Sequence, residues 1–335
     1  MKLLNCLGLA LAVAAFAGCG KKTDESAKPG EKTYTIAVIP KGTTHEFWKS
    51  IHAGAEKAKQ ELAAKGIQVE IFWKGPLRED DRDQQIQVVE NFTSRNVSGI
   101  VLAPLDSQAL VNPVNSAVQA GIPVVVMDSG LNSDKYLSFV ATDNFKGGQL
   151  AGQFMAKLLN DKGNVILLRY AVGSASTEER EKGFLDAMEK FPEIKIISSD
   201  QYAGPTVETA YQASQNLLNR FGDEVNGVFA VAEPATIAMT KALRDIGKAG
   251  GKVKMVGFDA GSKSVLDMKN GDVQGLAVQN PVLMGYLAVM TMVKHLQGEK
   301  VEKRIDTGVV LISPANMDQP AMEELLHPPL EKYLK

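Results

Sequence analysis

The sequence contains few cysteines, and both lie near the N-terminus. They are Cys6 and Cys19 in a chain of 335 residues. No disulfide bond can therefore form within the rest of the chain, whose stability must come from packing. The length exceeds that of a usual single domain, so the region after the N-terminus is predicted to form two domains, each with its own core.

The sequence also lacks the short motifs of common catalytic and cofactor sites. It has no GxSxG, P-loop, GxGxxG or HExxH motif, and residues 173–176 (GSAS) only superficially resemble a nucleophile turn. The four histidines have no cysteine partners, and His45 with His52 on one predicted helix supplies too few ligands for a structural zinc. We therefore expect no cofactor, no metal and no enzymatic activity.

The chain has no strong excess of charge of either sign. Its formal net charge is -2 at pH 7, which argues against a nucleic-acid binder that relies on counterion release. The hydrophobic fraction of 44% and the charged fraction of 23% are ordinary for a globular protein. The apolar stretch at residues 3–16 is too short for a convincing membrane span.

The N-terminus has the layout of a secretory signal. Lys2 is positively charged, residues 3–16 are apolar, and Ala17-Gly18 precede Cys19. Residues 16–19 (FAGC) resemble the lipobox of bacterial lipoproteins, whose cysteine is acylated after cleavage. This resemblance implies a signal peptide at 1–18, a lipid anchor on Cys19, and export to the cell envelope, in the periplasm or on the outer face of the cytoplasmic membrane. The alternative is an ordinary cleaved signal in which Cys19 is incidental.

Polar residues dominate the segment 19–32, which predicts a flexible tether. After it, short β-branched runs alternate with helical patterns, which is typical of βαβ units around parallel sheets. The sequence predicts a first series of strands at 34–39, 67–73, 99–103 and 122–128, and a second at 164–170, 194–200, 226–232 and 253–259. Residues 137–144 join the two series. A strand at 273–279, a helix at 281–297 and an extended segment at 306–313 follow.

Several short motifs in fixed order carry a family likeness over nearly the whole chain after the tether. They are THEFW (44–48), VVVMD (124–128), VATDN (140–144), GSASTEEREKGF (173–184), VGFD (256–259) and VQNP (278–281). This order resembles the type I periplasmic binding proteins, and most closely the ribose-type sugar-binding proteins of ABC importers.

The resemblance implies two doubly wound parallel-sheet domains joined by a three-segment hinge. We expect the chain to cross between the domains near 141–143, 278–280 and 306–309. The N-terminal lobe would then consist of 33–142 and 280–308, and the C-terminal lobe of 143–279 and 309–335. The implied function is the capture of a monosaccharide or related polyol between the lobes, by hinge closure, for the permease subunits of an ABC importer. The resemblance also implies a monomer that contacts the membrane only through its lipid anchor.

Sugar recognition needs directional partners for hydroxyl groups and an aromatic surface for the apolar face of the ring. The family resemblance assigns the aromatic role to Phe47 and Trp48, although both would also fit a core that caps the sheet. It assigns hydroxyl binding to Asp128, Asp259 and Gln279, which end predicted strands, and to Arg180 in the stretch 177–184. Asp128 would otherwise cap a turn, and Arg180 would otherwise form a surface ion pair with a neighbouring glutamate.

Four further residues are candidates for ligand contact. Lys41 follows the first strand, and His45 stands where ribose binders have asparagine, although a helix cap would explain it equally well. Tyr202 lies near a family aromatic position. Glu233 follows Ala232, where the family often has asparagine, but it would also suit the start of a helix.

Some positions depart from the ribose pattern. Ser129 replaces the arginine of ribose binders, which argues against ribose itself. Lys41, Arg180 and His45 together suggest an acidic ligand, whereas Asp128 and Asp259 favour a neutral polyol or an amino sugar. The charged run at 78–81 is interpreted mostly as a solvated loop.

Other functions remain alternatives. The loaded protein would serve equally well as a ligand-presenting sensor for a chemoreceptor or histidine kinase. A lipid-anchored carbohydrate-active enzyme would need a pair of acids such as Asp128 and Asp259. The regulatory domain of a transcription repressor is a remote alternative, because a signal segment stands where a helix-turn-helix would be.

Overall fold

The computed structural model describes residues 33–334. The predicted signal peptide, Cys19 and the predicted tether lie outside the described residues. No helix within the described range is long and apolar enough to cross a lipid bilayer.

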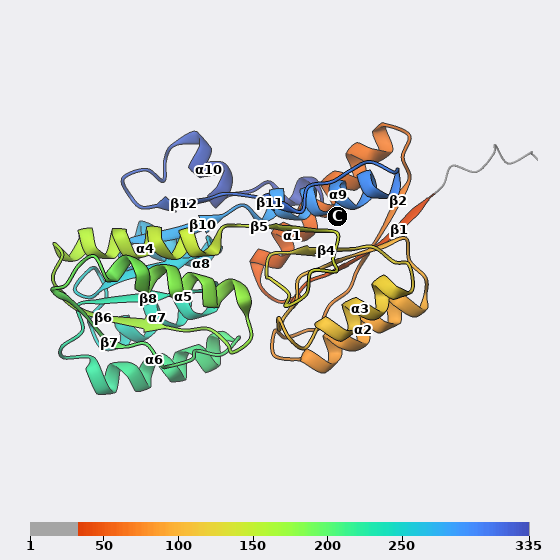
Figure 1. Cartoon of the computed structure of the whole chain (residues 1–335). Helices are drawn as coiled ribbons and strands as arrows, with labels where there is room; N and C mark the ends of the chain where they lie inside the picture. The colour runs from red at the N-terminus through yellow and green to blue at the C-terminus, as the bar shows by residue number, and fades with distance from the viewer. Residues whose placement is uncertain (1–32, 335) are drawn as a thin grey trace, which may run out of the picture. The chain divides into compact units, whose positions relative to one another are not determined.

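Two six-stranded sheets form the framework of the described chain (Figure 1). The first has the order β11-β5-β4-β3-β1-β2, and all its strands are parallel. Its members are β1 (Tyr34–Ile39), β2 (Val69–Trp73), β3 (Gly99–Leu102), β4 (Val124–Met127), β5 (Ser138–Ala141) and β11 (Arg304–Asp306). The second has the order β12-β10-β9-β8-β6-β7. Its members are β6 (Gly163–Leu168), β7 (Ile194–Ser198), β8 (Gly227–Ala230), β9 (Lys254–Phe258), β10 (Gly275–Gln279) and β12 (Val309–Ile312).

Helices cover both faces of each sheet. In the first lobe, α1 (Glu46–Ala64) and α9 (Pro281–Leu296) pack on one face, and α2 (Arg82–Ser94) and α3 (Val111–Gln119) on the other. In the second lobe, α4 (Asn144–Leu159) and α5 (Ala175–Met188) lie opposite α6 (Val207–Phe221), α7 (Glu233–Asp245) and α8 (Ser262–Lys269). This confirms the predicted fold of two doubly wound α/β domains.

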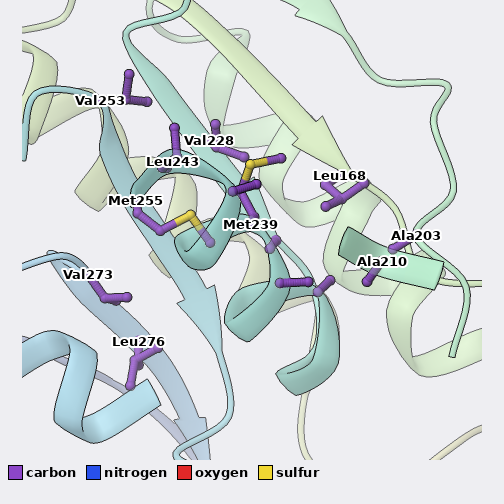
Figure 2. Packing of buried hydrophobic residues seen from close by; sticks show 14 of the residues in the cluster. Leu168, Ala203, Ala210, Val228, Met239, Leu243, Val253, Met255, Val273 and Leu276 are labelled. Atoms are coloured by element: carbon purple, nitrogen blue, oxygen red, sulfur yellow. The ribbon is translucent and has the colours of Figure 1, made fainter. Parts of the chain in front are cut away.

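The cores follow from the two-residue period of the strands. In β1, Ile36 and Val38 face α1 and α9, while Ala37 and Ile39 face α2 and α3, and all four are fully buried. Figure 2 shows the corresponding cluster in the second lobe, where Leu168, Val228 and Met255 from three strands pack against helix residues such as Met239. Each lobe thus has its own core on both faces of its sheet.

The chain crosses between the two sheets at three places. They follow β5, β10 and β11. Two of the crossings are held together, because Thr142 Oγ1 lies 3.3 Å from Thr307 Oγ1 and 3.2 Å from the Gly308 carbonyl oxygen. The Asp143 amide donates to Asp306 across the same junction, at 3.2 Å.

The extended segment predicted at 306–313 is two strands rather than one. It divides at Thr307-Gly308, where Gly308 has a positive φ of 78°. β11 completes the first sheet, and β12 joins the second sheet antiparallel to β10. β12 must run antiparallel because it enters the second sheet from the hinge, at the edge where the parallel strands end.

The C-terminal residues extend from the second lobe to the first. The short helix α10 (Pro320–Leu326) buries Leu326 in the core of the second lobe. The following turn, η1 (Leu330–Lys332), contacts α1 of the first lobe. The prediction that all of 309–335 lies in the C-terminal lobe does not include this contact of η1 with the first lobe.

Glycines allow the two helices on one face of each sheet to approach each other closely. A Cβ atom on Gly54 of α1 would lie 2.0 Å from the Val282 carbonyl oxygen of α9. In the second lobe, a Cβ atom on Gly148 of α4 would lie 2.0 Å from the Arg180 carbonyl oxygen of α5. Since such distances do not occur, any larger residue must separate the helices.

We predict that Gly148→Ala destabilises the protein by about 1–3 kcal/mol, because overpacking forces α4 and α5 apart. Chemical denaturation monitored by circular dichroism measures the change. Gly130→Ala is the matched control, since a Cβ atom there meets only Ala175 Cβ at an ordinary 3.5 Å. Equal stability of the two variants would contradict the close approach of the helices.

Candidate functional site

The carboxyl ends of the strands in both sheets meet at one cavity between the lobes. Parallel sheets place their binding residues at this edge because the loops after the strands converge there. The first lobe contributes residues such as Lys41 and Asp128, and the second contributes residues such as Arg180, Asp259 and Gln279. The cavity has a volume of about 40 Å³. The lobes therefore lie close together around it.

Asp128 and Asp259 occupy corresponding positions in the two lobes. Each follows the last residue of a strand, β4 or β9, and each has a left-handed backbone with φ of 63° or 69°. A non-glycine residue rarely adopts this conformation, and such strain concentrates at functional sites. Both carboxylates line the cavity and are mostly buried. The structure thus presents two acids from opposite lobes to the same space.

Lys41 is a buried cation that connects the two lobes. Its Nζ lies 3.4 Å from Asp128 Oδ2 and donates to Ser174 Oγ and Ser176 Oγ of the second lobe, at 3.3 and 3.1 Å. Burial raises the pKa of Asp128, and the charges of Lys41 and Arg180 oppose that effect. Lys41 therefore both compensates the charge of Asp128 and forms hydrogen bonds to the facing lobe.

Arg180 is buried rather than paired at the surface with the neighbouring glutamates. Its Nε donates to Asn144 Oδ1 at 2.9 Å, and its Nη1 donates to the Val231 carbonyl oxygen at 2.9 Å. The same Nη1 lies 3.8 Å from Asp259 Oδ2, and the guanidinium carbon lies 3.7 Å from the centre of the Phe258 ring. These contacts fix the guanidinium at the cavity wall.

Glu79 is the centre of a hydrogen-bond network that the sequence analysis missed. Its Oε1 accepts from Trp48 Nε1 at 2.7 Å and lies 2.6 Å from His45 Nδ1. Its Oε2 accepts from the hydroxyl of Tyr170, in the second lobe, at 2.7 Å. Arg78 in the same loop is exposed, as expected, but Glu79 is buried.

Topology alone indicates that an acid of this loop faces the cleft, but it does not show that the acid is Glu79. The loop after β2 lies at the same edge as the loops after β1 and β4, so one acid in a charged run there is positioned to face the cleft.

The network around Glu79 orients the aromatic residues. Trp48 is only 3% exposed, and the Phe47 ring packs edge-on against it with centroids 5.0 Å apart. Both rings line the cavity. Burial acts to lower the pKa of His45, but the hydrogen bond and charge of Glu79 outweigh it and raise the pKa.

Glu233 and Gln279 present unpartnered polar atoms. Gln279 Nε2 donates to Asp259 Oδ1 at 2.8 Å, while its Oε1 is buried and has no hydrogen-bond partner within residues 33–334. Glu233 Oε2 is likewise buried and unpartnered. Burial, together with the charge of Asp259, raises the pKa of Glu233 to about 7. Both residues line the cavity, so hydrogen-bond acceptors are available to a ligand there.

Three other positions named in the sequence analysis differ in whether they line the cavity. Tyr202 is not among the residues that line the cavity, and its ring stacks under Arg169, 4.5 Å from the guanidinium carbon. Ser129 is fully buried, and its Oγ accepts from the Ser176 amide across the cleft at 3.1 Å. Ala232 lines the cavity.

Comparison with known proteins agrees with this architecture. A family model described as a periplasmic binding protein domain matches residues 36–300. The ribose import binding protein RbsB of Haemophilus influenzae is 31% identical over 279 residues, which cover 83% of this chain and 91% of that protein.

Two solved structures are similar over most of the chain. A carbohydrate transporter solute binding protein from Agrobacterium radiobacter, in complex with D-arabinose, has a TM-score of 0.83 and 32% identity, covering 89% of this chain and 100% of that one. An ABC transporter solute binding protein from Agrobacterium vitis with bound D-fucose has a TM-score of 0.82 and 35% identity, covering 88% and 100%. The resemblance to the periplasmic binding proteins is confirmed, and the chain belongs to that family.

Proposed function

We propose that this chain is the substrate-binding component of an ABC-type sugar importer and captures a monosaccharide or related polyol between its lobes. The observation that carries the proposal is the pair of buried, unpartnered acceptors at the cavity, Glu233 Oε2 and Gln279 Oε1. A buried polar atom without a partner costs about 1–3 kcal/mol. The hydroxyl groups of a sugar would supply the missing donors.

The remaining chemistry of the cavity suits a sugar. Asp128 and Asp259 offer acceptors from opposite lobes, and the ring of Phe47 or Trp48 offers an apolar surface for the C–H face. The ligands of the two similar structures, D-arabinose and D-fucose, are both monosaccharides, which supports the same class here.

Capture proceeds by closure about the three hinge segments. A ligand that contacts both lobes binds the closed form better than the open form, and it shifts the equilibrium by that difference in affinity. The closed protein then presents both lobes in a fixed relation to the permease subunits. We further propose that the protein acts as a monomer.

The chain binds its ligand without turning it over. Hydrolysis of a glycoside would require an acid pair such as Asp128 and Asp259. Both are engaged by cations of their own lobes, Lys41 at 3.4 Å and Arg180 at 3.8 Å. This pairing suits fixed acceptors better than a proton donor.

We predict that Asp259→Asn weakens sugar binding at least about 100-fold, because it removes a charged acceptor and leaves Arg180 without its acid partner. Asparagine tolerates the left-handed backbone at this position, so the fold should persist. Isothermal titration calorimetry against a panel of aldoses and polyols, including D-arabinose, D-fucose and D-ribose, measures the effect. Asp223→Asn, at an exposed position, is the control, and an unchanged affinity of the Asp259 variant would remove this residue from the site.

We predict that Tyr170→Phe raises the Kd for the sugar about tenfold. In the closed protein the variant leaves Glu79 Oε2 buried without its hydrogen-bond donor, whereas water hydrates that oxygen in the open form. The substitution therefore destabilises the closed form relative to the open form. Titration calorimetry with the best ligand of the panel gives the Kd. Tyr211→Phe, whose hydroxyl bonds to Asp245 at the surface, should bind normally. Equal affinities of the two variants would show that the contact between Tyr170 and Glu79 does not contribute to closure.

We also propose that Cys19 anchors the exported protein to a membrane by its acyl chains. Several chains together hold a protein stably, because each buried methylene contributes about 0.8 kcal/mol. Cys19→Ser should move the protein from the membrane fraction to the soluble fraction of cells that express the full-length sequence. Retention of the variant in the detergent phase after phase partitioning would argue against the anchor.

A further inference from the structure

The charges around the cavity do not balance. Among the described residues that line it are three basic side chains, Lys41, His45 and Arg180, and four acidic ones, Glu79, Asp128, Glu233 and Asp259. All seven are largely withdrawn from water, so each charge needs a partner nearby.

The three basic residues are each paired with one acid of their own lobe. Lys41 lies 3.4 Å from Asp128, and Arg180 lies 3.8 Å from Asp259. His45 lies 2.6 Å from Glu79. The basic groups therefore have partners before any ligand arrives.

Glu233 is the acid that remains. It is 8% exposed, its Oε2 is buried without a hydrogen-bond partner, and among the described residues its carboxylate forms no ion pair. The charged groups that act on it are Asp259 after β9, His45 and Glu46 at the start of α1, and Glu79 after β2. Three of these four groups are acidic, which favours a positive ligand group at Glu233, and the unpartnered Gln279 Oε1 lines the same cavity.

We propose that the preferred ligand is an amino sugar, a monosaccharide whose protonated amine pairs with Glu233 and donates to Gln279 Oε1. The proposal rests on the sugar-capture function proposed above and narrows it to one chemical class. An ammonium group would supply both the missing positive charge and the missing donors. A sugar acid would instead add negative charge beside Glu233 and Asp259.

The pKa of Glu233, about 7 in the protein without ligand, gives the proposal a pH signature. An ammonium group binds the ionised carboxylate, so amine binding must displace the proton that Glu233 carries at lower pH. Affinity for an amino sugar should therefore rise about fivefold between pH 6 and pH 7, with release of about half a proton at pH 7. The amine itself stays mostly protonated over this range.

The experiment uses matched sugars that differ in one group. Titration calorimetry compares D-galactose, D-galactosamine and D-galacturonate, and the corresponding D-glucose set, with the wild-type protein and with Glu233→Gln. The glutamine variant keeps the shape of the side chain and removes the buried charge, so it should fold at least as stably as the wild type. Glu208→Gln, at an exposed position on α6, is the control.

The amine member of a set should bind the wild type at least about tenfold more tightly than the neutral member, a difference that Glu233→Gln abolishes together with the pH dependence. A neutral member that binds the wild type as tightly as the amine would overturn the inference and leave sugar capture intact. Preference for the acid member would overturn it in the same way. Failure of every sugar, including the aldoses and polyols of the wider panel, would contradict sugar capture itself.

Discussion

Four carboxylates and three basic side chains lie between the lobes, where little water reaches them. The lobes must also separate to admit a ligand, so an arrangement that paired charges across the cleft would break buried ion pairs at every opening. The structure avoids this cost, because Lys41 pairs with Asp128 within the first lobe and Arg180 with Asp259 within the second. The direct contacts across the cleft use neutral partners, such as Ser174, Ser176 and the hydroxyl of Tyr170. These contacts exchange readily with water.

The two lobes place their binding residues by the same local means. Asp128 and Asp259 each follow a buried parallel strand and turn into the cleft with a left-handed backbone. Glycines at the helix contacts allow α1 to pack closely against α9 in one lobe and α4 against α5 in the other. In the second lobe this close approach also fixes the position of Arg180, since Gly148 lies against its carbonyl oxygen. Helix packing and ligand geometry are therefore linked in that lobe.

Much of the fold was predictable from the sequence because its causes are local. Apolar strands such as Tyr34–Ile39 alternate with helical patterns, which predicts βαβ units around parallel sheets, and the family resemblance implied their doubly wound arrangement in two domains. The division of 306–313 was expected only from the family resemblance, which implied a crossing near 306–309. The local pattern does not show it, because both halves read as extended chain and tertiary packing decides which sheet receives each of them. The path of the C-terminal residues back to α1 was also not predictable from the local sequence. It depends on tertiary packing rather than on local pattern.

The site was predictable where a residue ends a strand, as with Asp128, Asp259 and Gln279, all of which line the cavity. Glu79 was missed because it lies in a charged loop in which its neighbours are solvated, and only the fold shows which acid turns inward. Tyr202 was assigned by family position alone, and here it stacks on Arg169 instead of lining the cavity. The ligand preference depends on pairing among side chains, which sequence spacing does not reveal.

The central claim is that a sugar is held by both lobes at once and closes them. Double electron–electron resonance tests it directly, since the chain has no cysteine after Cys19 to compete with introduced labels. In a background with both Cys6→Ser and Cys19→Ser, spin labels at the exposed positions Glu90 on α2 and Asn219 on α6 report the separation of the lobes. A saturating amount of the tightest-binding sugar should shift a broad distribution of distances to one narrow, shorter distance. A distribution that the bound sugar leaves unchanged would contradict capture by closure.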